Sequence, residues 1–256
     1  MIDSIKKDSL EFFNANGLPS KKLENWKFTS SKNFKNFNKS SSKAEKQKIE
    51  SDELSIVFIN GVLDIDSLEN FKFSDLLEVK NLNEIDNEEL LHCSANFLNE
   101  SMFNLGVSEF ENGNYLSFKK NSVVDEVINI KNYFFENGEN ERVSSYNIFH
   151  INEGSEISII EEDIKENYSI FNLKLNKFIC ENSSILKYGK SFNDDSQTHS
   201  LSYNYYQIEK DVALSVDSMV KSSFFNKEFI EVDLNNVGSD AKITILNLGK
   251  QEQHVD

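Results

Sequence analysis

The pattern of apolar and polar residues changes near residue 110 of the 256-residue chain. Beyond that point helical spacing is absent, and β-branched and aromatic residues alternate with Ser, Asn and Gly, which is typical of short strands. Four stretches repeat one order of strand, polar turn and second strand: residues 146–160, 175–188, 203–216 and 229–246. An aliphatic residue precedes each turn: Ile151, Ile179, Ile208 and Leu234.

These four aliphatic residues recur at intervals of 28, 29 and 26 residues. A strand–turn–strand unit cannot bury its own apolar face, so neighbouring units must stack. The near-constant interval favours a parallel β-helix over an antiparallel sandwich, in which strands and turns also recur. We therefore expect the four residues to form an inward ladder. Burial of each contributes about 1.5–3 kcal/mol, so Ile179→Asp should unfold the domain.

Two regions are predicted to precede the β-helix core, which we place at residues 110–256. Residues 1–50 indicate an N-terminal helical region and linker, in which a first helix ends near Asn16-Gly17 and a short helix runs towards Trp26. Residues from Lys32 to Lys48 are mostly Ser, Asn and Lys, as in a loosely packed connector.

Residues 51–109 are predicted to form a mixed α/β region. The segment 54–59 is a strand candidate, and Asn60-Gly61 is a strong hairpin signal. Apolar residues between Leu90 and Leu105 are spaced as on a helix that ends near Gly106. The predicted fold class is therefore mainly β, with a small helical and mixed N-terminal region ahead of a parallel β-helix.

Acidic residues outnumber basic residues by 43 to 27, which gives a formal charge of −16. Such a fold repels phosphate backbones, and Arg142 is the only arginine that could read guanine or phosphate. No apolar run approaches the roughly 18 residues of a membrane span, and the N-terminus lacks the apolar segment of a secretory signal. We expect neither a nucleic-acid nor a membrane partner.

Cysteine and histidine residues do not fall at metal-ligand spacings. Cys93 and Cys180 lie far apart, with only His92 adjacent to Cys93. We expect both to be buried or neutral thiols that bind no metal or cluster by themselves. His150 is expected at a surface or rim, and His199 in a polar loop. The sequence predicts no catalytic, cofactor-binding or metal-ligating residue.

The only proline and the only tryptophan of the chain lie in residues 17–29, which read Gly-Leu-Pro-Ser-Lys-Lys-Leu-Glu-Asn-Trp-Lys-Phe-Thr. This segment resembles the N-terminal signature Gly-Leu-Pro-x-x-Lys-x-Glu-x-Trp-Lys-Tyr-Thr of the SufB/SufD family, with Phe28 in place of the tyrosine. Residues 253–256, Gln-His-Val-Asp, are similar to a run inside the family's β-helix. The form of the first signature points to the SufD branch.

The resemblance implies a right-handed parallel β-helix and a function. Proteins of this kind are non-catalytic cytoplasmic scaffold subunits of the SUF iron–sulfur cluster assembly machinery. They pair with a SufB-like β-helix subunit and dock the ATPase SufC. The chain is therefore not expected to be an enzyme. An iron–sulfur cluster is implied for the full complex, whereas no cofactor is expected on this chain alone.

The resemblance also implies that the family's β-helix continues beyond residue 256 and is followed by the helical domain that docks SufC. We therefore expect an N-terminal fragment with an incomplete β-helix and without that docking segment. Cys180 and His254 do not occupy the family's cluster-associated positions, so no such role passes to them. Ile243, Ile245 and Leu246 would form an exposed final strand, and such an open edge should promote self-association.

Two other functions stay open at this level. One is a generic β-solenoid binding module. The other is a polysaccharide-acting β-helix enzyme, in which acids on adjacent coils share one outer sheet. The acids available for such a site are Glu161, Glu162, Asp163, Asp194, Asp195 and Asp217.

Overall fold

The computed structural model of the chain describes most of its residues. The described residues are 1–40, 49, 51–86, 91, 93–111, 113–135, 138, 140–165, 169–193, 198–221, 224–234, 236–249 and 253–256, without the side chains of residues 33, 165, 192 and 193. The fold is mainly β: a parallel β-solenoid of about four turns follows a small helical N-terminal region. The predicted fold class is confirmed, whereas the predicted domain boundaries stay a prediction.

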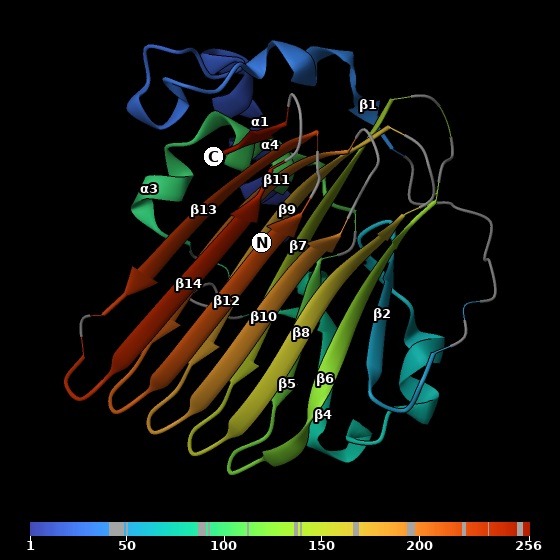
Figure 1. The fold of residues 1–256 in the computed structure, drawn as a ribbon, viewed down its shortest axis with the longest axis vertical. Helices are drawn as coiled ribbons and strands as arrows, with labels where there is room; N and C mark the ends of the chain where they lie inside the picture. Colours follow the sequence, from blue (N-terminus) through green and yellow to red (C-terminus); the bar gives the residue numbers. More distant parts are fainter. Residues whose placement is uncertain are drawn as a thin grey trace.

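Two sheets face each other along the solenoid, and the chain alternates between them (Figure 1). The first sheet contains β5 (Asn114–Phe118), β7 (Glu141–Ile151), β9 (Ile170–Cys180), β11 (His199–Ile208), β13 (Phe225–Asp233) and β15 (His254–Val255), with β4 (Leu77–Asn81) at its edge and β1 (Asn38–Lys39) on β7. The second contains β6 (Val123–Phe134), β8 (Glu156–Lys165), β10 (Ile185–Asn193), β12 (Ala213–Lys221) and β14 (Asp240–Leu248), with β2 (Ser55–Ile59) and β3 (Val62–Leu63).

The tight turns that join the first sheet to the second stack on one another. Each contains one residue with positive φ: Asn121, Gly154, Ser183, Asp211 and Gly238. Backbone hydrogen bonds connect successive turns, such as Gly154 N to Asn182 O at 3.1 Å. A left-handed residue is easiest for Gly and tolerated by Asn and Asp, which explains the polar composition of the predicted turns.

The register of the first sheet corrects the predicted inward ladder. Ile151 pairs with Cys180, and Cys180 pairs with Ile208, so these three buried residues form the ladder. Ile179 precedes Cys180 and therefore faces the other side of the sheet, because side chains alternate along a strand. Leu234 follows β13 and is 53% exposed. The prediction was right for Ile151 and Ile208 and wrong for Ile179 and Leu234.

Two cores result from this alternation. The inner core lies between the facing sheets and includes Phe149, Phe178 and Tyr206, whose rings stack at 4.9 and 4.6 Å between centroids. The outer core lies between the outward face of the first sheet and the N-terminal region. It includes Trp26 and Phe34 from that region, and Phe34 stacks on Phe171 of β9 at 4.7 Å.

The N-terminal region covers the first sheet with short elements. It contains α1 (Ile2–Asn16), η1 (Glu24–Trp26) and η2 (Ser31–Asn36). Gly17 ends α1 with a φ of 65° and donates its N–H to Phe13 O at 2.7 Å, as predicted for Asn16-Gly17. The described part of the predicted connector contains η2 and β1, and residues 41–48 lie outside the described residues.

The segment before the solenoid joins both sheets. β2 and β3 form the predicted hairpin, in which Asn60 and Gly61 have φ values of 46° and 79°. The remaining short elements are η3 (Ile65–Asn70), η4 (Ser74–Leu76) and η5 (Leu82–Glu84).

The helix predicted between Leu90 and Leu105 is interrupted. The structure has α3 (Ala95–Leu98) and α4 (Ser101–Glu109) in its place, and Leu90 lies outside the described residues. Asn104 of α4 bridges the break, because its side-chain amide donates to Leu98 O at 2.8 Å and Glu100 O at 2.9 Å. Among the described residues, no helix combines the length and apolar character needed to cross a membrane.

Candidate functional site

The segment 17–29 is held against the outward face of the first sheet by one buried side chain. Trp26 has no solvent exposure and contacts Phe34 and Phe229 at 6.1 and 6.0 Å between ring centroids. Its indole Nε1 donates to Glu100 Oε2 at 2.9 Å, which satisfies its only polar group. The tryptophan of the predicted signature thus anchors the segment to α4 and β13.

The second predicted motif adds a strand beside β13. Residues 254 and 255 form β15, in which His254 lies opposite Phe225 and their rings stack at 5.5 Å. Asp256 continues this pairing, since its N–H donates to Asn226 O at 2.9 Å. Figure 1 shows the C-terminus beside the N-terminal helices.

The two motifs meet at Thr29, 225 positions before His254 in the chain. The Thr29 hydroxyl lies 3.1 Å from His254 Nε2 and donates a short hydrogen bond to Asp256 Oδ2. Lys227 Nζ lies 2.5 Å from the same carboxylate oxygen. Its ammonium group is also 5.3 Å from the Trp26 ring centroid, within cation–π range. We call these five residues, Trp26, Thr29, Lys227, His254 and Asp256, the signature junction.

The signature junction lacks the arrangement of a nucleophilic triad. In such a triad the carboxylate contacts the imidazole, which contacts the hydroxyl. Here the imidazole and the carboxylate both contact the Thr29 hydroxyl. Partial burial raises the pKa of Asp256, but hydrogen bonds from Lys227 and Thr29 outweigh it, so the net pKa is lowered. A carboxylate with a lowered pKa is a weak base and is poorly suited to accept a proton in catalysis. The geometry therefore fits a structural contact that holds the two segments together.

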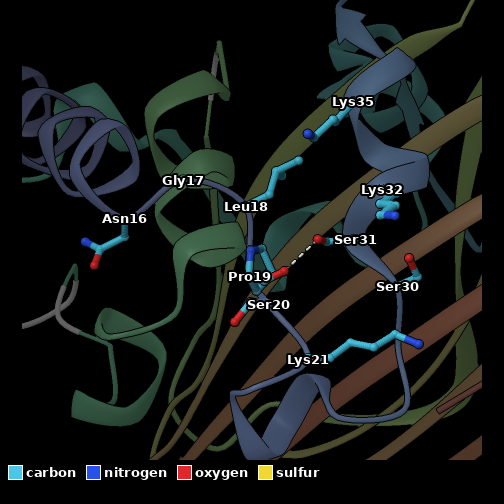
Figure 2. Close-up of a pocket in the computed structure, with 10 residues that line it drawn as sticks. All are labelled: Asn16, Gly17, Leu18, Pro19, Ser20, Lys21, Ser30, Ser31, Lys32 and Lys35. Atoms are coloured by element: carbon cyan, nitrogen blue, oxygen red, sulfur yellow. Dashed lines mark hydrogen bonds between the residues drawn. The ribbon is translucent and has the colours of Figure 1, made fainter.

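A hollow of about 720 Å³ is lined in part by the beginning of the segment 17–29 (Figure 2). Its walls come from residues 16–21 and 30–35. Ser31 Oγ donates to Pro19 O at 2.6 Å and fixes the two walls to each other. Lys21, Lys32 and Lys35 are exposed around the hollow, and its lining contains no acidic residue.

Charged residues are also buried between the two sheets. Lys174 of β9 forms ion pairs with Glu161 and Asp163 of β8, the second at 2.8 Å. The three side chains are 2–3% exposed. Asn132 donates to Glu161 Oε1 at 2.8 Å, and Tyr188 donates a short hydrogen bond to Glu161 Oε2. These bonds provide the partners that buried charges require.

A second buried charge lies one coil further along. Lys190 Nζ is 3.1 Å from Glu228 Oε1, and it donates to Ser202 Oγ at 3.0 Å. Glu228 also accepts hydrogen bonds from Asn204 Nδ2 at 2.8 Å and Ser218 Oγ at 2.9 Å. The inner core is therefore apolar near the stacked turns and ionic further from them.

An asparagine ladder runs along the inner face of the first sheet. Asn114 donates to Asn147, Asn147 to Asn176 and Asn176 to Asn204, at 2.8, 3.2 and 3.1 Å. Neither this ladder nor the buried ion pairs were predicted. The signal for the ladder was the recurrence of Asn at 147, 176 and 204, within the repeat already found in the sequence.

The comparison with protein families agrees with the fold and with the second motif. Residues 134–256 match the family model "SUF system FeS cluster assembly, SufBD core domain". This match begins at the end of β6 and includes β7 to β15. It supports the SufB/SufD family and a role in SUF iron–sulfur cluster assembly. No curated protein matches the chain.

The acids considered for polysaccharide chemistry all lie within the SufBD core match, and the described ones lie on both faces of the second sheet. Glu161 and Asp163 point between the sheets and pair with Lys174, whereas Glu162 and Asp217 are exposed. Asp194 and Asp195 lie outside the described residues. Of the described acids, only Glu162 and Asp217 lie on the outward face of the second sheet, on β8 and β12 with β10 between them. They are therefore not on adjacent coils, as that hypothesis requires.

The predicted histidines have defined partners. His150 lies on the outward face of the first sheet, with 12% of its side chain exposed. Its Nδ1 is 2.7 Å from Tyr115 Oη and its Nε2 is 3.1 Å from Glu181 Oε1. Burial lowers the pKa of His150, although Glu181 acts in the opposite direction. His199 begins β11 and is buried against the Phe37 ring at 5.0 Å, so its predicted place in a polar loop was wrong.

The two cysteines are free thiols in different cores. Cys180 belongs to the inner core, and Cys93 packs against the outer core. Burial raises the pKa of each thiol to about 12. The described residues contain no group of three His, Cys, Asp or Glu side chains placed to hold a metal ion. That neither thiol binds a metal or cluster by itself stays a prediction.

Proposed function

We propose that the protein is a scaffold subunit of the SUF iron–sulfur cluster assembly machinery, of the SufD branch. The observation that carries this proposal is the SufBD core match over residues 134–256, which covers the solenoid from β7 to β15. The signature junction adds support, because residues 17–29 carry the SufD-like form of the family signature and contact the matched core at His254 and Asp256.

The proposed role is non-catalytic. A scaffold needs a rigid surface, and the buried ion pairs and asparagine ladder fix the register of successive coils. The lysines buried between the sheets, Lys174 and Lys190, pair with carboxylates of the facing sheet, as expected for structural groups. The iron–sulfur cluster is then a product of the assembled complex, and we place it on no residue of this chain.

The proposed partners are a SufB-like β-helix subunit and a SufC-like ATPase, in the cytoplasm. β14 offers a surface for strand pairing, since it is an edge strand among the described strands. Ile243, Ile245, Leu246 and Leu248 on this strand are 42–52% exposed. An exposed strand edge of this kind accepts a further strand.

Co-expression with a SufB-like subunit and a SufC-like ATPase tests the proposal. We expect the tagged protein to retain the SufB-like subunit through affinity and size-exclusion chromatography, at a defined stoichiometry by light scattering. A variant with Ile245→Lys and Leu248→Lys should weaken this complex if β14 contributes. A folded protein that retains neither component would contradict the proposed function.

A further inference from the structure

The segment that forms the hollow differs in charge from the rest of the molecule. Residues 17–40 contain six lysines and one acidic residue, Glu24, which gives a formal charge of +5. Because the whole chain has a formal charge of −16, the residues outside this segment carry a formal charge of −21. Half of these six lysines, Lys21, Lys32 and Lys35, line the one hollow shown in Figure 2.

These three lysines differ in their partners from several exposed lysines elsewhere on the molecule. Lys72 pairs with Glu126, Lys120 with Glu153 and Lys187 with Glu156. No ion pair joins Lys21, Lys32 or Lys35 to a carboxylate of the described residues. In a chain with a surplus of acids, three lysines around an acid-free hollow leave a local positive potential available to a ligand.

The hollow is held open by the fold. Ser31 connects its two walls through the Pro19 carbonyl, and Pro19 itself is buried. Trp26 and Thr29 attach the same segment to the first sheet. The lysine side chains are therefore presented from a fixed backbone, which reduces the ordering cost of binding.

We propose that the hollow and its three lysines form a docking surface for an acidic polypeptide segment of a partner protein. Exposed lysines are flexible point charges, which suits a run of carboxylates more than one enclosed anion. The acidic remainder of the molecule repels such a segment, so this surface also fixes the orientation of the encounter. The inference is independent of the proposed function, because it rests on charge and geometry alone.

A fluorescently labelled hexaglutamate peptide tests the surface, with hexaglutamine as the uncharged reference. The full chain should bind hexaglutamate, and raised ionic strength should weaken the binding, as for exposed charges. The variant Lys21→Gln/Lys32→Gln/Lys35→Gln should raise the Kd about tenfold, since each exposed charge contributes a modest amount. All three side chains are exposed, so thermal unfolding should stay unchanged and confirm folding.

The matched control changes the net charge by the same amount elsewhere. Lys72→Gln/Lys120→Gln/Lys187→Gln removes three exposed lysines that pair with acids. This variant should keep the Kd within about twofold, because it leaves the hollow intact. An equal loss in both triple variants would overturn the proposal, since net charge alone would then explain it. Equal binding of hexaglutamine would overturn it as well.

Two further outcomes would assign the hollow to another occupant. Pyrophosphate that displaces hexaglutamate at one site per chain, and binds more tightly, would indicate a small-anion site. Self-association of the wild-type protein that the hollow variant abolishes in sedimentation would indicate a second copy of the chain. Either result overturns the proposal of an acidic partner segment.

Discussion

Two lysines, Lys174 and Lys190, are buried between the sheets and paired with carboxylates. Burial of a charged group costs several kcal/mol and is tolerated only when partners surround it. Lys174 meets this requirement through Glu161 and Asp163 from the opposite sheet. These attractions outweigh the desolvation that lowers its pKa, so its pKa is raised and the ammonium form persists.

Lys174→Met should lower the free energy of unfolding by about 3–5 kcal/mol, because Glu161 and Asp163 would remain buried without an opposing charge. Urea denaturation of both proteins measures this difference. The matched control is Lys187→Met on β10, where the lysine is 60% exposed and pairs with Glu156 at 3.3 Å. That exposed pair should contribute about 0–1 kcal/mol. Similar losses in the two variants would contradict the assigned role of the buried network.

His150 should make the fold sensitive to mild acid. Burial lowers its folded pKa below the ordinary value of 6.5. The unfolded chain therefore binds a proton before the folded protein does as the pH falls below about 6.5. The stabilising contribution is fully present above that pH and is lost towards the folded pKa. Urea denaturation of wild type and His150→Gln across this range should show a smaller pH dependence in the variant.

Glu181→Gln tests the same residue in the opposite direction. Glu181 raises the pKa of His150 and so opposes the effect of burial, while Lys177 adds to the lowering. Its removal should lower the folded pKa further and increase the loss of stability in acid. A Glu181→Gln protein with less acid sensitivity than wild type would contradict this assignment.

At the scale of elements, the signature junction connects the N-terminal segment to β13 and β15. Thr29→Val keeps the shape of the side chain and removes the hydrogen bonds to Asp256 and His254. Loss of a hydrogen bond to a charged group costs about 1.5–3 kcal/mol. We expect hydrogen exchange to accelerate in residues 17–29 and 253–256 before it changes elsewhere.

The matched control for Thr29 lies on the exposed side of β14. Thr244→Val makes the same chemical change at an exposed position. It should change neither the stability nor exchange at the two signature segments. If Thr29→Val behaved like Thr244→Val, the contact between the signatures would contribute nothing to holding them together.

The register of the strands could not be predicted from the sequence. The Ile-rich ends of the strands identified the repeat, yet a one-residue offset placed Ile179 in the ladder where Cys180 belongs. Both faces of the first sheet are buried, so Ile179 and Cys180 meet apolar surroundings on opposite sides. Apolar character therefore could not assign the face, and only the pairing with Ile151 and Ile208 does so.

At the scale of the whole molecule, the N-terminal region and the solenoid share the outer core. Trp26→Ala should lower the free energy of unfolding by about 3–5 kcal/mol, the usual cost of a fully buried tryptophan. Because the outer core covers the first sheet, the variant should also bind more of a hydrophobic dye. Chemical denaturation and dye fluorescence measure the two effects.

Phe28→Ala is the control for Trp26→Ala within the same segment. Phe28 is 76% exposed, whereas Trp26 has no exposed surface. Its truncation should change stability by less than about 0.5 kcal/mol. Equal effects at the two positions would mean that the segment does not cover the sheet as a packed unit.

The sequence by itself determined the periodic part of this protein. Turn residues, alternating strands and a nearly constant interval predicted stacked β-coils, because these properties follow from local backbone preferences and side-chain alternation. The helix end at Gly17 and the hairpin at Asn60-Gly61 were predictable for the same reason. The two signature segments were also visible as short motifs.

Only the tertiary structure decided which distant segments of the chain contact each other. Thr29 and His254 are remote in the chain, and their contact exists because the N-terminal region folds back over the first sheet. Lys174 and Glu161 are acceptable in the interior only because facing strands bring them together. Local preference carries no information about such pairings, since their free energy depends on burial and distance that arise after the coils have stacked.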